Sequence, residues 1–118
     1  MSQRTVRLAI LVLGLFTGLV HLVLLNVSFV QETGSPDLLF TLNGLGYLAL
    51  LIAFFWERVP FFATRRPLLH YLFIAYAAVT VLAWVAMGAR NAIGYTTKLA
   101  EILLIAALVV DLRLEKKA

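Results

Sequence analysis

Four long apolar segments constrain this chain more than any other feature. They cover residues 8–29, 38–56, 68–87 and 92–110, and the first three contain no Asp, Glu, Lys or Arg. Each is about 20 residues long, which is the length that an α-helix needs to cross a bilayer. Apolar residues make up 63% of the chain and charged residues 14%, whereas about a quarter of a soluble domain is charged. We therefore predict an all-α integral membrane four-helix bundle.

The rest of the chain is too short to form a second domain. We predict a single membrane domain over residues 1–118, with an up-down-up-down order of spans. Residues 30–37 and 88–91 form the predicted outer loops, and residues 57–67 form the predicted cytoplasmic loop. A functional site must then lie inside the bundle or at its ends.

The basic residues predict how the chain is oriented. Eight of them fall on one side of the predicted spans: Arg4, Arg7, Arg58, Arg65, Arg66, Arg113, Lys116 and Lys117. Arg90 is the one basic residue of the opposite loops. The positive-inside rule then predicts that both termini are cytoplasmic and that the protein is multi-pass in the cell membrane. The lipid bilayer is the predicted partner, with attraction to anionic headgroups, and the pattern excludes nucleic acid.

Polar residues inside the spans are the candidate site, because each is costly in hydrocarbon unless it has a partner. A rise of about 1.5 Å per residue places His21, Asn43 and Lys98 roughly 4 to 6 Å outward of the bilayer centre, with Thr80 and Glu101 closer to it. We therefore predict one buried polar layer. Its members are His21, Asn43, Tyr47, Thr80, Lys98 and Glu101.

Each member of this layer has a structural and a functional interpretation. Lys98 and Glu101 are three residues apart and can form an ion pair, but Lys98 can also extend its ammonium toward outer water. Glu101 either belongs to a structural pair or binds a proton or ligand. His21 either forms a helix-packing hydrogen bond or serves as a ligand.

Small residues predict close helix contacts. Gly14 and Gly18 share a helix face with His21, and Gly44 and Gly46 lie beside Asn43 and Tyr47. Glycines at such spacing let helix backbones approach each other. We predict that these four glycines pack helices within one chain.

Several chemistries are excluded by the same residues. The chain has no cysteine, so disulfides, thiolate nucleophiles and iron–sulfur clusters are ruled out. His21 and His70 lie at different predicted depths, so one chain cannot hold a haem between them. One histidine and one carboxylate beside a lysine are a poor metal site. We predict no catalytic, cofactor-binding or metal-binding residue, no cofactor, and no enzymatic activity.

Several short motifs carry a resemblance. They are His21-Leu22, the segment Leu42-Asn43-Gly44-Leu45-Gly46-Tyr47-Leu48, the stripe Tyr76/Thr80/Trp84, and Lys98 with Glu101. With them the chain resembles small uncharacterised four-span membrane proteins of haloarchaea and some bacteria, with DoxX-like size and layout. The resemblance implies a prokaryotic cell membrane and no assigned activity.

Three functional hypotheses follow. The first is a non-enzymatic accessory or assembly subunit of a membrane complex, which binds other membrane subunits or itself. The second is an oligomeric proton- or cation-coupled transporter of small solutes that uses Glu101. The third is a quinone- or lipid-binding redox accessory that uses the aromatic stripe.

Overall fold

The structure is a computed structural model that describes residues 2–56, 66–87 and 92–117. The chain forms α1 (Gln3–Leu19), a π-helix η1 (Val20–Leu24), α2 (Leu25–Thr33), α3 (Leu38–Phe55), α5 (Arg66–Met87) and α6 (Ala92–Lys117). Four helical stretches are long and apolar enough to cross a membrane, because α1, η1 and α2 run on as one rod. The predicted all-α bundle of four apolar helices is confirmed.

Parts of the predicted topology lie outside the described residues. These parts are the loop residues 57–65, with Arg58 and Arg65, and the outer turn 88–91. Arg66 begins α5 and Lys117 ends α6, with Lys116 beside it. Arg4 and Arg113 are exposed, whereas Arg7 is partly buried.

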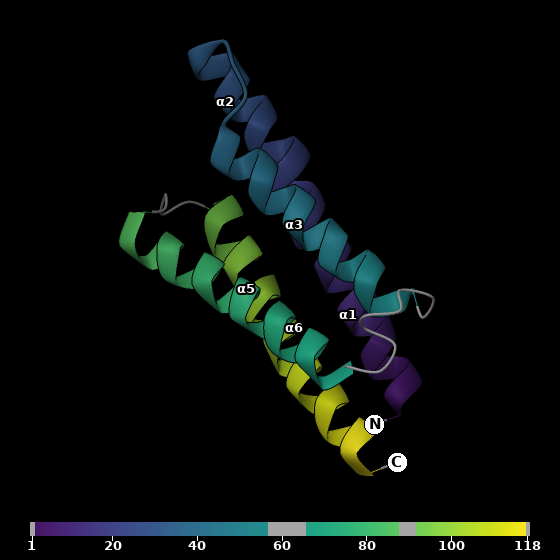
Figure 1. Ribbon diagram of the computed structural model, residues 1–118. Coiled ribbons are helices and arrows are strands. Elements are labelled where there is room, and N and C mark those ends of the chain that lie inside the picture. The colour runs from purple at the N-terminus through teal and green to yellow at the C-terminus, as the bar shows by residue number, and fades with distance from the viewer. Residues whose placement is uncertain (1, 57–65, 88–91, 118) are drawn as a thin grey trace.

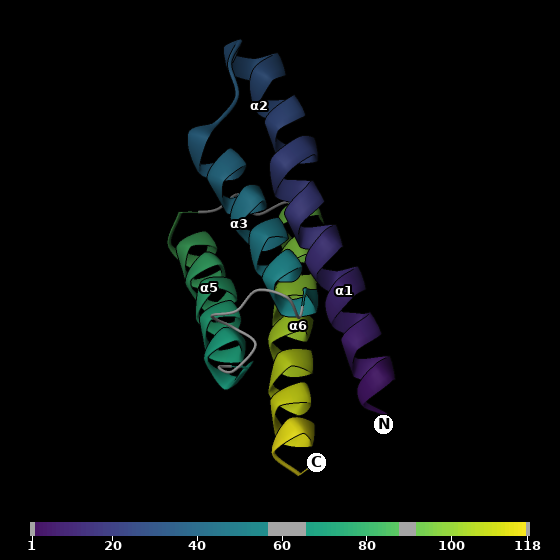
Figure 2. The same ribbon diagram turned by 45° about the vertical axis from the view of Figure 1, so that its right-hand side comes forward.

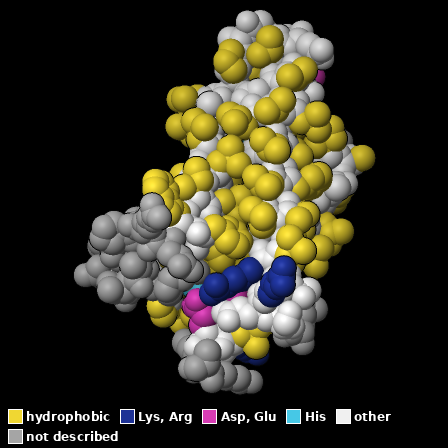
Figure 3. All heavy atoms as spheres, turned by 90° about the vertical axis from the view of Figure 1, so that its right-hand side faces the viewer, with side chains coloured by type: hydrophobic (Ala, Val, Ile, Leu, Met, Phe, Trp, Pro, Cys, Tyr) yellow, Lys and Arg dark blue, Asp and Glu magenta, His cyan; other side chains and the backbone are white. Residues whose placement is uncertain are grey.

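The helices form a ring in which each contacts two neighbours. The rod of α1, η1 and α2 packs against α3 and α6, and α5 packs against the same two helices. Both termini lie at one end of the bundle (Figures 1 and 2). One face of the molecule is apolar over most of its length and has charged side chains gathered near that end (Figure 3).

Asn26 fixes the hairpin between α2 and α3. Its Nδ2 donates to the Leu22 carbonyl oxygen at 2.8 Å and to the Thr41 hydroxyl at 2.9 Å, and its Oδ1 accepts from the Asp37 amide at 2.9 Å. Asp37 caps α3 by accepting from the Phe40 amide. Gly34 ends α2 with φ +85°, a conformation that glycine adopts readily.

The four predicted packing glycines all lie in contacts within the chain. A Cβ atom at Gly14 would meet the Leu51 side chain, and one at Gly18 would meet Leu48 and Tyr47. A Cβ at Gly46 would clash with the Tyr76 hydroxyl. Among these four glycines, Gly44 is the one where a Cβ would meet backbone atoms, at 2.7 Å from the Gly18 carbonyl oxygen and from the Leu22 amide nitrogen. Gly44 therefore sets the distance between the first helical rod and α3.

We expect the variant Gly44→Ala to lower the free energy of unfolding by about 2 to 3 kcal/mol, a typical cost of overpacking. The new methyl group would meet backbone atoms that move only with the whole helix. Gly14→Ala is the matched control, because its methyl would meet the end of a flexible leucine side chain. Denaturant titration in detergent micelles, followed by tryptophan fluorescence, measures both. Equal losses in the two variants would contradict the assignment of Gly44 as the tight contact.

Candidate functional site

Glu101 lies at the centre of a buried polar cluster. Its side chain is fully buried, and its Oε1 accepts from the Lys98 ammonium at 2.7 Å and from the Thr17 hydroxyl at 3.3 Å. Its Oε2 accepts from the Tyr47 hydroxyl at 3.0 Å. Three helices thus supply donors to one carboxylate. We call Thr17, His21, Tyr47, Lys98 and Glu101 the Glu101 cluster.

His21 completes this cluster from the π-helix η1. Its Nδ1 lies 2.8 Å from the Thr17 carbonyl oxygen, which can only accept, so Nδ1 carries a hydrogen. The other ring nitrogen, Nε2, lies 3.9 Å from the Glu101 Oε1. Residues Val20–Leu24 contain no proline or glycine that would account for the wide turn. Single π-turns inside α-helices occur frequently at functional sites.

The charges of the Glu101 cluster are compensated within it. Lys98 is 6% exposed and Glu101 is fully buried, so neither ion has more than slight contact with solvent or lipid. An isolated buried charge is very costly, and pairing with further hydrogen bonds offsets that cost. Both carboxylate oxygens are occupied by donors from this chain. The arrangement can hold the helices in one register, and its His21 and Glu101 side chains can each carry a proton.

Asn43 and Thr80 form a second polar group beside the first. The Asn43 Nδ2 donates to the Thr80 hydroxyl at 3.1 Å, and that hydroxyl donates to the Tyr76 carbonyl oxygen. The Tyr76 hydroxyl in turn donates to the Asn43 carbonyl oxygen at 2.7 Å. The rings of Tyr47 and Tyr76 meet edge to face with centroids 4.9 Å apart. The six residues of the predicted layer thus divide into two adjoining groups.

A second, partly buried ionic cluster lies nearer the end that carries both termini. We call Arg7, His70, Asp111 and Glu115 the Asp111 cluster. Asp111 is fully buried, accepts from the His70 Nε2 at 2.7 Å and pairs with the Arg7 Nε at 3.2 Å. Glu115 pairs with the Arg7 Nη2 at 2.6 Å and lies 3.7 Å from the His70 Nδ1. This cluster joins α1, α5 and α6.

The sequence interpretation missed the Asp111 cluster. It used Arg7 only to orient the chain, considered His70 only as a haem ligand, and ended the fourth span before Asp111. One signal was available: Glu101, Leu104, Leu108, Asp111 and Glu115 follow alternating spacings of three and four residues. Such spacing places all five on one helix face. Leu104 and Leu108 are fully buried on that face, between the two clusters.

The Asp111 cluster also contains the donor types of a metal site. One ligand atom from each of His70, Asp111 and Glu115 lies within 4.8 Å of the other two. However, the Arg7 guanidinium already pairs with both carboxylates. A cation would have to displace this guanidinium, so we interpret the cluster as an ion-pair network that connects three helices.

Comparison with known proteins gives a family and no activity. No curated protein and no solved structure matches the chain. A family model described as "Family of unknown function (DUF7475)" matches residues 1–111. Because this match covers nearly the whole chain, the four-helix bundle and both ionic clusters fall almost entirely within it, and the chain belongs to the DUF7475 family of unknown function.

Proposed function

We propose that this chain is a non-enzymatic accessory or assembly subunit of a membrane complex, multi-pass in a prokaryotic cell membrane with both termini cytoplasmic. The closed Glu101 cluster carries this proposal. Both oxygens of its carboxylate accept hydrogen bonds from this chain, and the side chain is fully buried. The polar atoms are thus used to hold the helices together.

The outer surface fits a role in assembly. Large apolar side chains are exposed on every helix, among them Leu8, Leu39 and Leu82. These exposed side chains occur on all four helical stretches of membrane-spanning length. Lipid tails or the helices of other membrane subunits are the contacts that suit it.

A proton- or cation-coupled transporter is the second candidate. One observation favours it: the π-helix places the His21 Nε2 3.9 Å from the Glu101 carboxylate. A small movement would bring these atoms within hydrogen-bond distance, and a proton taken up from water by either group could then pass to the other. The ion pair with Lys98 would have to open during such a cycle.

A paired variant separates the two candidates. Lys98→Met combined with Glu101→Gln removes both charges together and so avoids leaving one of them unpaired. We expect no pH-dependent flux in vesicles with the wild-type chain, and unchanged co-purification of membrane subunits with the paired variant. Wild-type flux that the paired variant abolishes would overturn the subunit proposal and favour transport.

A further inference from the structure

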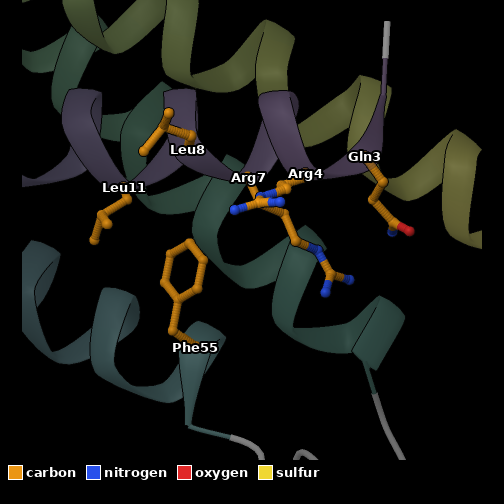
Figure 4. A pocket seen from close by; sticks show the side chains of 6 residues that line it. All are labelled: Gln3, Arg4, Arg7, Leu8, Leu11 and Phe55. Atoms are coloured by element: carbon orange, nitrogen blue, oxygen red, sulfur yellow. The ribbon is translucent and has the colours of Figure 1, made fainter.

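A groove opens at the end of the bundle that carries both termini. It has a volume of about 540 Å³ and is lined by the first turns of α1 and the last residue of α3. The lining residues are Gln3, Arg4, Arg7, Leu8, Leu11 and Phe55. Figure 4 shows the three apolar side chains toward one end of the groove, Gln3 toward the other, and the two arginines between them. The groove therefore has a polar half and an apolar half.

We propose that this groove binds a phospholipid with a net negative headgroup. The headgroup phosphate would lie against Gln3, Arg4 and Arg7, and an acyl chain would lie along Leu8, Leu11 and Phe55. This site is independent of the proposed function, since either a subunit or a transporter can carry it.

The position of the groove along α1 fits the lipid boundary. Arg7 precedes Thr17 of the Glu101 cluster by ten residues, or about 15 Å along a helix. This distance is half the thickness of a hydrocarbon core of about 30 Å. With the Glu101 cluster near the bilayer centre, Arg7 and Arg4 lie at headgroup level. Leu8 and Leu11 then lie beside the part of the acyl chains that is next to the headgroups.

The polar half of the groove offers donors that lack acceptors. The Gln3 Nε2 is buried and has no hydrogen-bond partner among the described residues, which is costly for an amide. A turn of this side chain toward the groove would let Nε2 donate to a phosphate oxygen. Arg4 is exposed and forms no ion pair with any residue that the structure describes. The ion pairs of Arg7 with Asp111 and Glu115 use its Nε and Nη2 and hold its guanidinium in place. A guanidinium has five N–H donors, so further donors remain for phosphate oxygens.

The apolar half of the groove argues for a lipid and against a free anion. Leu8 is 59% exposed and Phe55 40% exposed, and both suit contact with an acyl chain. Inorganic phosphate would leave these side chains uncovered. A zwitterionic lipid would bring its own cation close to two guanidinium groups. The arginines therefore favour a headgroup with net negative charge.

Lipid retention tests the proposal. The purified chain in detergent is mixed with equal amounts of phosphatidylglycerol and phosphatidylcholine, and bound lipid is measured by native mass spectrometry. We expect the wild-type chain to retain phosphatidylglycerol preferentially. We expect Arg4→Gln to reduce this retention about fivefold, because one basic residue near a membrane surface contributes about 1 kcal/mol of binding free energy. Arg113→Gln is the matched control, because Arg113 is an exposed arginine of α6 that does not line the groove.

A charge-neutral variant separates the groove from general surface attraction. Gln3→Ala removes the buried amide without changing the net charge, and we expect it to reduce phosphatidylglycerol retention as well. Equal retention of the two lipids by the wild-type chain would overturn the proposal. So would equal losses in Arg4→Gln and Arg113→Gln, which would show surface attraction only. Full competition by inorganic phosphate would show an anion site without a lipid requirement and would also overturn it.

Discussion

The variant Glu101→Gln is expected to lower the free energy of unfolding by about 3 to 5 kcal/mol, the typical cost of breaking a buried ion pair. Glutamine keeps the shape of the side chain but leaves the Lys98 ammonium without its counter-ion. Lys98 is 6% exposed, so water compensates little of this loss. Denaturant titration in detergent micelles, followed by circular dichroism, measures the change.

The paired variant Lys98→Met with Glu101→Gln provides the control for this prediction. It removes both charges, and paired ions in a protein interior can often be replaced by neutral side chains at little cost. We therefore expect the paired variant to recover most of the stability that Glu101→Gln loses. A paired variant as unstable as the single one would show that the stability depends on the hydrogen bonds that the Glu101 carboxylate accepts from Thr17 and Tyr47, and not on the ion pair with Lys98.

Helix depth alone predicted much of the Glu101 cluster. The spacing along each apolar segment placed His21, Lys98 and Glu101 at a similar level, and the structure brings these three side chains together. Depth does not say which helices are neighbours. It therefore could not show that Tyr47 reaches Glu101, whereas Asn43, one helical turn away, pairs with Thr80 on α5.

The local sequence does not predict two other features, the π-turn at His21 and the hydrogen bonds of Asn26. The π-turn at His21 lies in the segment Val20–Leu24, which has ordinary helix-forming and β-branched residues, so tertiary packing must decide its conformation. Asn26 lies near the end of the first apolar segment, where polar residues are common. Its three hydrogen bonds become visible only when the α2–α3 hairpin is closed.

The Asp111 cluster could not be assigned without knowing that α6 lies between α1 and α5. Positive charge near a membrane boundary predicts orientation, and that rule treats Arg7 like any other basic residue. In the structure Arg7 also pairs with two carboxylates of α6. One residue can thus contribute to both topology and stability. Arg7 differs from the exposed Arg4 in its contacts with α6, and these contacts depend on the order of the helices in the ring.

The variant Asp111→Asn is the second substitution with a large expected effect, a loss of about 3 kcal/mol or more in the free energy of unfolding. Asp111 is fully buried and accepts from both Arg7 and His70. Its loss leaves both side chains with the partly exposed Glu115 as the remaining carboxylate of the cluster. Glu115→Gln is the matched control. Its side chain is 21% exposed, so we expect a loss of about 1 kcal/mol or less.

Denaturant titration of both variants, with and without a chelating agent, tests the ion-pair interpretation of this cluster. Because the Arg7 guanidinium already pairs with both carboxylates, we expect the chelating agent to leave the unfolding of the wild-type chain unchanged. A wild-type chain destabilised by the chelating agent would instead indicate a bound cation held by His70, Asp111 and Glu115. Losses of about 1 kcal/mol or less in both Asp111→Asn and Glu115→Gln would show that burial of Asp111 adds nothing, and the connection of α1, α5 and α6 would then depend on apolar packing.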